Sequence, residues 1–269
     1  MPSIPSQRLR SSDAELVYWT LGDGPQVVLL HPFPLHHEFW LPVAGTLSGR
    51  YRLILPDLRG HGESEIGEGS ATMEKHAADL VRLMDDVGIG RAPIIGVSIG
   101  GYILFEYCRR HRNRVAALGL CNTKAPADNA EARAARLQSA NDVLERGTEP
   151  FFESMALRAF GRTTQESRPD LVQGAMQMMR KMSPQDVAAV QRGMAERPDS
   201  VETLKTITIP ALLITGEEDN LTGRNEAELM RQHIAGSQLH VISKAGHYSP
   251  WEQPEQVARV LRQFLDSLK

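Results

Sequence analysis

This chain contains a series of short apolar runs separated by segments with helical periodicity, and few folds accommodate that order. The apolar runs are Ala14–Thr20, Gln26–His31, Tyr51–Asp57, Ala92–Ser98, Val115–Asn122, Ala211–Asp219 and Ser237–Ser243. From Tyr51 onward, strand-like runs alternate with helical patterns such as Met73–Val87, which is typical of βαβ units and a mostly parallel sheet. The unbroken apolar run Ala211–Ile214 fits a strand that is covered on both faces. An α/β fold with helices flanking a central sheet is therefore expected.

The alternation stops after Asn122. From Lys124 to about Leu204 the sequence shows helical patterns and no convincing strand, and Ile209-Pro210 then reopens the sheet. We therefore expect a core α/β domain formed by residues 1–122 and 205–269, with residues 123–204 as a helical insertion between two strands.

Composition excludes several classes of function. The formal net charge of −3 provides no basic excess for a nucleic acid partner, and the apolar runs are too short to span a membrane. Met1–Arg10 lacks the apolar core of a signal peptide, and Cys108 and Cys121 are expected to be buried reduced thiols. No Cys/His cluster has the spacing of metal ligands. These features predict a cytoplasmic protein that needs no metal or cofactor.

A serine lies in a strand–turn–helix context that favours nucleophilic chemistry. Gly96-x-Ser98-x-Gly100 follows an apolar strand and opens a helical pattern, as a nucleophile elbow does. Glycine at both flanking positions removes Cβ atoms that a turn this sharp would bring into collision. The alternative is a glycine-rich phosphate loop, but neither a dinucleotide nor a Walker pattern is present. Ser98 is therefore predicted to be the nucleophile.

A serine hydroxyl needs a general base, and the base needs an orienting acid. In hydrolases with such an elbow, the acid follows the serine along the chain and ends a late strand. Asp219 ends the run that begins at Ala211, and Gly216 lets the chain turn before it. The adjacent Glu217 and Glu218 compete for the role, although a solvated acidic loop explains them better.

The base should follow the last strand, and His247 is the histidine that does so. It comes after Ser237–Ser243, in a loop where Gly246 precedes it. Other histidines lie within that strand, on a helix face or near helix ends: His240, His76, His111 and His233.

Acyl transfer also needs two donors directed at the developing oxyanion. The backbone N–H of Ile99 is one candidate, because it follows Ser98 at the start of a helix. In the loop after the early strand, Pro32 and Pro34 have no N–H, so Phe33 is the expected second donor. A proline-stiffened turn without a catalytic role is the alternative for that loop.

Taken together, these motifs resemble the α/β-hydrolase superfamily, and within it the small bacterial esterases and the 3-oxoadipate enol-lactonase-like group. The resemblance rests on Leu30–Pro34, Leu55–Ser64, Gly96–Gly101, Gly216–Asp219 and Gly246–His247, in the order that the family has. It implies an α/β-hydrolase fold and hydrolysis of a carboxylic ester or lactone of a small molecule through an acyl-enzyme.

The resemblance also implies that the helical insertion is a cap over the site. Its Phe151, Phe152 and Met155 are candidates to line the substrate pocket, with Trp40 and Tyr248 at its border. Packing within the cap or the core explains each of them equally well. An enol-lactone with a free carboxylate would need a nearby cation, but the cap carries many arginines and the sequence does not select one.

Two other functions stay open. Similar triads hydrolyse a carbon–carbon bond in ring-fission products, and some superfamily members are non-catalytic ligand sensors. Serine at position 98 disfavours the dehalogenase and epoxide hydrolase activities, whose relatives carry aspartate there. The sequence does not define the oligomeric state.

Overall fold

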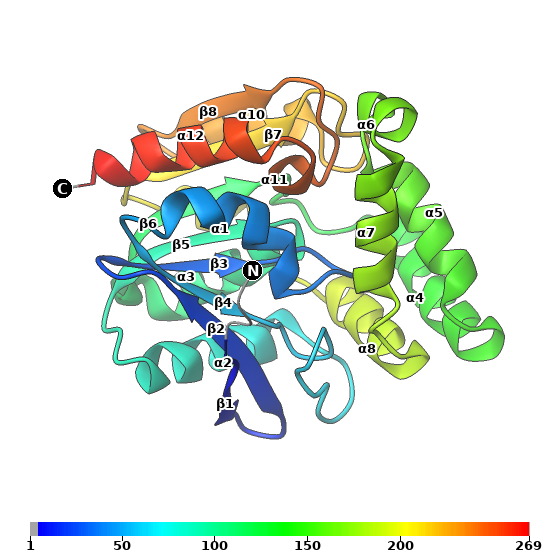
Figure 1. Cartoon of the computed structure of the whole chain (residues 1–269). Coiled ribbons are helices and arrows are strands. Elements are labelled where there is room, and N and C mark those ends of the chain that lie inside the picture. The colour runs from blue at the N-terminus through cyan, green and yellow to red at the C-terminus, as the bar shows by residue number, and fades with distance from the viewer. Residues whose placement is uncertain (1–4, 269) are drawn as a thin grey trace.

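The computed structural model describes residues 5–268 and contains an eight-stranded sheet with helices on both faces (Figure 1). The strands are β1 (Gln7–Arg10), β2 (Glu15–Leu21), β3 (Gln26–Leu30), β4 (Arg52–Pro56), β5 (Ala92–Val97), β6 (Val115–Cys121), β7 (Ala211–Gly216) and β8 (Gln238–Ile242). Their order across the sheet is β1-β2-β4-β3-β5-β6-β7-β8. Strands β3 to β8 pair in parallel, and β1 and β2 form an antiparallel edge.

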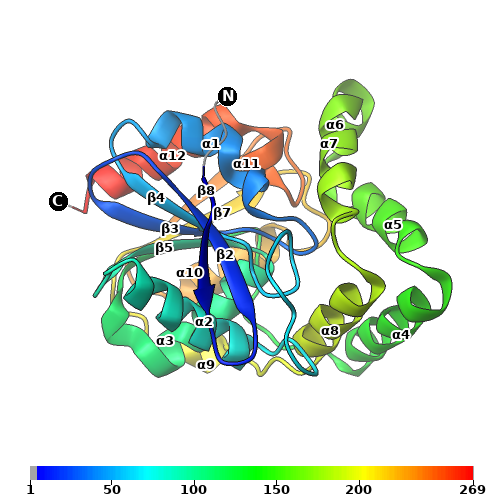
Figure 2. The same cartoon turned by 60° about the horizontal axis from the view of Figure 1, so that its bottom comes forward.

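Helices cover the two faces of the sheet in separate groups, as Figure 2 shows. One group contains α1 (Leu41–Leu47), α11 (Ser249–Glu252) and α12 (Pro254–Asp266). The other contains α2 (Met73–Asp86), α3 (Ile99–His111), α9 (Val201–Leu204) and α10 (Arg224–His233). Because both faces are covered, β5 and β7 are buried almost throughout, as their continuous apolar sequences indicate.

The remaining α-helices form one excursion between β6 and β7, which are neighbours in the sheet. They are α4 (Ala130–Arg146), α5 (Glu149–Ala159), α6 (Arg162–Ser167), α7 (Pro169–Met179) and α8 (Pro184–Ala195). In Figure 1 these green helices lie beside one end of the sheet. The Ser200 N–H donates to the Ala125 carbonyl at 3.0 Å and so joins the two ends of the excursion.

The expected α/β-hydrolase architecture is confirmed, and each of the seven expected strands is present. Strand β1 was not expected, because its sequence Gln-Arg-Leu-Arg is short and polar. Two short 3₁₀ segments, His37–Trp40 and Arg112–Arg114, complete the described elements. Cys108 and Cys121 are both buried and unpaired.

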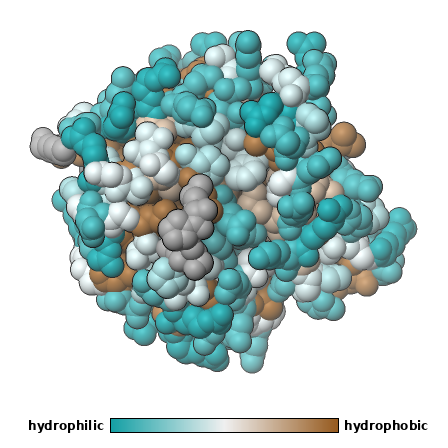
Figure 3. All heavy atoms as spheres, viewed as in Figure 1, coloured by the Kyte–Doolittle hydropathy of each residue, from teal (hydrophilic) through white to brown (hydrophobic). Residues whose placement is uncertain are grey.

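Among helices within residues 5–268, none combines the length and apolarity that crossing a bilayer would require. Hydrophilic side chains cover most of the face seen in Figure 3, and the apolar patches on it are separated from one another.

Candidate active site

The expected nucleophile lies at a strained turn between β5 and α3. Ser98 has φ 55° and ψ −111°, a left-handed conformation that residues with a Cβ rarely adopt. A Cβ built on Gly96 would lie 2.5 Å from the Gly100 carbonyl carbon, so glycine is required for this close approach. The Ser98 carbonyl accepts from the Thr123 hydroxyl at 2.8 Å, and its N–H donates to the Cys121 carbonyl at 3.0 Å. These contacts hold the turn in its strained shape.

The close approach gives a stability prediction. Gly96→Ala should destabilise the fold by about 2 kcal/mol or more, because the new methyl group meets backbone that cannot rotate away. Gly45→Ala is the matched control, since nothing lies within 4 Å of a Cβ at this helical position. Urea unfolding of both variants measures the difference. Equal midpoints for the two variants would show that the elbow tolerates a side chain.

The expected acid and base are hydrogen-bonded to each other. Asp219 follows β7, and its Oδ2 lies 3.1 Å from Nδ1 of His247, which follows β8. The carboxylate also accepts from the Leu221 and Thr222 backbone N–H groups, at 2.8 and 3.0 Å. Burial alone would raise the pKa of Asp219, but the interaction with His247 and the hydrogen bonds that the carboxylate accepts hold it well below its ordinary value. Asp219 therefore stays ionised and can orient a neighbouring imidazole.

Two polar side chains complete this network and were not expected from the sequence. Asn122 follows β6 and donates from Nδ2 to Asp219 at 2.9 Å. Thr222 donates its hydroxyl to the same Asp219 oxygen at 2.9 Å and lies 3.1 Å from His247 Nδ1. Asn122 has φ 45°, and Ser249 donates to its side-chain oxygen at 2.5 Å. A polar residue directly after a buried strand was the available sequence signal for Asn122.

The two competing glutamates point elsewhere. Glu217 accepts from the Lys244 N–H at 3.1 Å. Glu218 accepts from both the backbone N–H and the hydroxyl of Thr163, at 2.8 and 2.5 Å. Glu218, which a solvated acidic loop was expected to explain, is half-buried and anchors the start of α6.

Both expected oxyanion donors lie near the serine. Phe33 and Ser98 line the same cavity, and Ile99 is the first residue of α3. Within residues 5–268, neither the Phe33 nor the Ile99 backbone N–H has a protein acceptor. Two unpaired amides beside a serine hydroxyl can both donate to an oxygen bound there.

The cavity beside Ser98 and His247 has a volume of about 330 Å³, and its lining contains both apolar and polar side chains, which we call its apolar and polar walls. Its apolar side includes Phe33, Phe151, Met155 and Leu221, and its polar side includes Lys124, Asp128, Arg136, Arg158 and Gln191. Phe151 and Met155, two of the expected pocket residues, line this cavity. Three others are fully buried and are not among its lining residues: Trp40, Phe152 and Tyr248. The Tyr248 hydroxyl nevertheless donates to the carbonyl of the lining residue Phe33.

The polar wall is built around one buried carboxylate. Asp128 contacts Arg136 at 2.5 Å, Arg197 at 2.9 Å and Lys124 at 3.2 Å. Burial opposes its ionisation, but these cations, Arg136 foremost, lower the pKa of Asp128 to about 2. Three cations around one carboxylate leave a net positive charge at this wall, and Lys124 and Arg136 carry it to the cavity surface.

Comparison with known proteins identifies the fold family. A family model described as the alpha/beta hydrolase fold matches residues 25–254. The chain belongs to the α/β hydrolase family. It is 28% identical over 247 residues to 3-oxoadipate enol-lactonase 1 of Acinetobacter baylyi, covering 92% of this chain and 91% of that protein.

Solved structures agree with this membership. A malate-bound thermophilic esterase from Thermogutta terrifontis is 37% identical, with a TM-score of 0.94 over 97% of this chain and 99% of that one. The enol-lactonase from Burkholderia xenovorans is 26% identical, with a TM-score of 0.90 over 97% of this chain and 100% of that one. This α/β hydrolase is thus similar to both esterases and lactonases.

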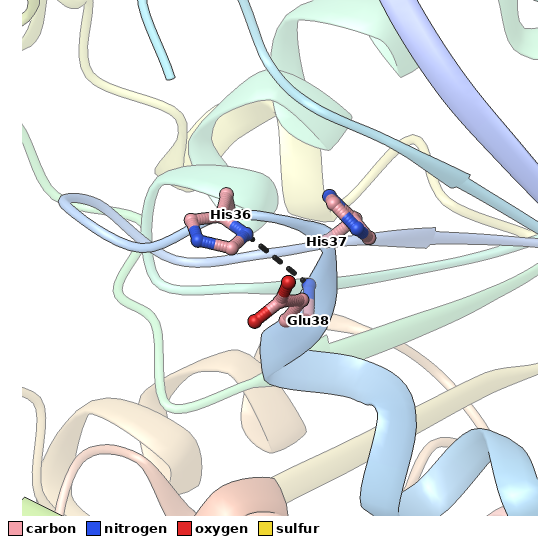
Figure 4. A group of neighbouring side chains, drawn as sticks. All are labelled: His36, His37 and Glu38. Atoms are coloured by element: carbon pink, nitrogen blue, oxygen red, sulfur yellow. Dashed lines mark hydrogen bonds between the residues drawn. The ribbon is translucent and has the colours of Figure 1, made fainter. Parts of the chain in front are cut away.

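In this α/β hydrolase, one group of three side chains lies close enough together to hold a metal ion. His36, His37 and Glu38 follow β3, and Figure 4 shows them at the start of the 3₁₀ segment. His37 Nδ1 is 2.8 Å from Asp57, and its ring stacks on Trp19 with centroids 3.3 Å apart. His36 Nδ1 accepts from the Glu38 N–H, which places the proton of its neutral ring on Nε2. The contacts support a structural role for the group, in fixing the loop that carries Phe33.

Proposed function

We propose that this α/β hydrolase cleaves a carboxylic ester or lactone of a small molecule through an acyl-enzyme. Ser98 is the nucleophile, His247 the general base and Asp219 the acid that orients it. The observation that carries the proposal is that His247, hydrogen-bonded to Asp219, lines the same cavity as the strained Ser98.

In the proposed reaction, Ser98 Oγ attacks the substrate carbonyl carbon while His247 Nε2 accepts the hydroxyl proton. The backbone N–H groups of Phe33 and Ile99 donate to the oxyanion of the tetrahedral intermediate. The C–O bond to the leaving alcohol breaks, and His247 returns the proton to that oxygen. Water then repeats the sequence on the acyl-enzyme and releases the acid and Ser98. Side chains and backbone fill every role, so the mechanism needs no cofactor or metal.

We assign the roles of core and cap to the segments expected from the sequence. Residues 1–122 and 205–269 form the core, and residues 123–204 form the cap. The cavity supports this division, because the core supplies Ser98 and His247 while α5 supplies Phe151 and Met155. The unpaired thiols Cys108 and Cys121 are compatible with a reducing, cytoplasmic location.

The charge of the polar wall favours a substrate that carries an anionic group besides its ester. Lys124 and Arg136 present the excess positive charge to the cavity, whose lining also includes apolar side chains. Related proteins fit this chemistry, because one is named for the dicarboxylate 3-oxoadipate and another holds malate. We propose that the carboxylate of the substrate lies against this wall.

A matched pair of esters tests both parts of the proposal. Monomethyl adipate should be hydrolysed with a kcat/KM about tenfold above that of methyl hexanoate, which lacks the terminal carboxylate. Lys124→Met should remove most of this preference and leave methyl hexanoate within about twofold of wild type. Lys205→Met, which removes an exposed lysine paired with Glu202, is the control.

The possible results of this experiment test the anion site and the esterase activity separately. Equal loss for both esters in Lys124→Met would contradict the anion site while leaving the hydrolase intact. No turnover of either ester, nor of a short-chain nitrophenyl ester, would contradict the esterase proposal and favour a ligand sensor.

A further inference from the structure

We propose that Glu252 is a positioning residue that holds the His247 loop and the α5–α6 turn of the cap together as one unit. This inference rests on the proposed function, because it concerns how the base is placed relative to the substrate wall. Glu252 lies in α11, has an exposed fraction of only 4%, and takes no part in the reaction steps described above.

The carboxylate of Glu252 accepts hydrogen bonds from two different segments. On one side, Oε1 accepts from the backbone N–H groups of Gly246 and Tyr248, at 2.9 and 3.2 Å. These residues flank His247 in the chain. On the other side, Oε2 accepts from the Gly161 N–H at 2.9 Å and from the Thr164 hydroxyl at 2.6 Å. One buried side chain therefore joins the base loop to the turn that ends α5.

Direct contacts between the two segments show how tightly they are joined. The His247 N–H donates to the Ala159 carbonyl at 2.7 Å. A Cβ built on Gly246 would lie 2.6 Å from that carbonyl oxygen, and a Cβ on Gly161 would lie 2.8 Å from the Gly246 nitrogen. Glycine at both positions lets the two backbones touch. We call this arrangement of Glu252 and residues 159–164 and 246–248 the clasp.

The clasp has a consequence for substrate placement. Helix α5 ends at Ala159, and its Phe151 and Met155 form part of the apolar cavity wall. Since the same turn is bonded to the backbone of His247, the wall and the base keep a fixed relative position. Reaction rates depend steeply on such positioning, and small displacements are expressed mainly in kcat.

Burying the carboxylate of Glu252 costs desolvation free energy, and this cost indicates that its contacts have a role. Desolvation raises the pKa of Glu252 although four donors surround its oxygens. A buried carboxylate needs hydrogen bonds to replace its lost hydration, and here the donors come from two different segments of the chain. A role in geometry explains its presence better than a role in stability.

Glu252→Gln is the sharpest test, because glutamine keeps the shape and cannot satisfy all four donors. Its oxygen can still accept from Gly246 and Tyr248, and its amide can donate to the Thr164 hydroxyl. The amide then faces the Gly161 N–H. Because both groups are hydrogen-bond donors, they repel each other, and the α5–α6 turn should move away from the side chain. Because Ala159 belongs to the same turn, its carbonyl should withdraw from the His247 N–H.

The expected result is a kcat about tenfold or more below wild type, with KM within about threefold, on any ester that wild type hydrolyses. Glu255→Gln is the matched control: it removes the same charge from an exposed position three residues along the chain. Thr164→Val removes one clasp bond without a charge change and should lower kcat by a smaller factor. Combining it with Glu252→Gln should cost no more than Glu252→Gln alone.

Hydrogen exchange gives a readout that does not depend on turnover. In Glu252→Gln, the amides of residues 159–164 and of His247 should both exchange faster than in wild type, and neither should change in Glu255→Gln. An unchanged His247 amide together with wild-type kcat would overturn the clasp. If wild type hydrolyses no ester, the proposed function is wrong, and the exchange of the His247 amide alone decides for or against the clasp.

Discussion

Ser98→Ala is expected to reduce ester turnover by at least about 10,000-fold while the protein stays folded. The reason is that the substitution removes the only side-chain hydroxyl of the elbow Gly96–Gly101, and Ser98 lines the cavity together with His247. The residual rate should come from binding and from the oxyanion donors alone. Steady-state kinetics on a short-chain nitrophenyl ester measures the loss, and circular dichroism checks the fold.

Covalent labelling supplies the control for this result. An organophosphonate should modify wild type at Ser98 and leave Ser98→Ala unmodified, as mass spectrometry of the intact protein would show. A variant that keeps wild-type kcat would contradict the assignment of the nucleophile, whatever the labelling result.

Asp219→Asn should lower kcat by about 10,000-fold with little change in KM, since it keeps the shape of the carboxylate and loses its charge. The asparagine amide would face Nδ1 of His247 and favour the wrong tautomer for accepting the Ser98 proton. Asp219 also links catalysis to stability. Its pKa is lowered in the folded protein, so its stabilising contribution is present above the unfolded value of about 3.9 and lost on further acidification.

The neighbouring Glu217 is the control for Asp219. Glu217→Gln removes an equal charge two residues away and should leave kcat within about twofold of wild type. If Glu217→Gln were the crippling change instead, the acid would have been assigned to the wrong residue at the end of β7.

The fold was predictable because two local patterns agree with each other over most of the chain. Buried strands such as β5 and β7 have continuous apolar sequences, and the helices between strands have amphipathic spacing. Strand β1 was not predicted, because it lies at the edge of the sheet, where only its Leu9 is buried. A short polar edge strand carries almost no periodic signal.

The site was predictable only where chain order carries information. Ser98, Asp219 and His247 follow strands in a set order, and a glycine lies next to the turn at each of them. Asn122 and Thr222 contact Asp219 because of the directions in which their side chains point, and the spacing of residues in the sequence does not reveal those directions. Large aromatic residues are ambiguous for a similar reason, since Phe151 lines the cavity while its neighbour Phe152 is fully buried on another side of the same helix.

The helical excursion leaves the sheet at β6 and returns at β7, and these two strands are direct neighbours. The Ser200–Ala125 hydrogen bond closes its base, and the clasp at residues 159–164 is a second attachment of the excursion to the core. The entropy of closing such a loop grows slowly, by about 0.6 kcal/mol for each doubling of its length. As long as the α5–α6 turn of the clasp is kept, an architecture of this kind lets the helices that line the cavity lengthen, shorten or be exchanged without a change in the sheet that carries Ser98, Asp219 and His247.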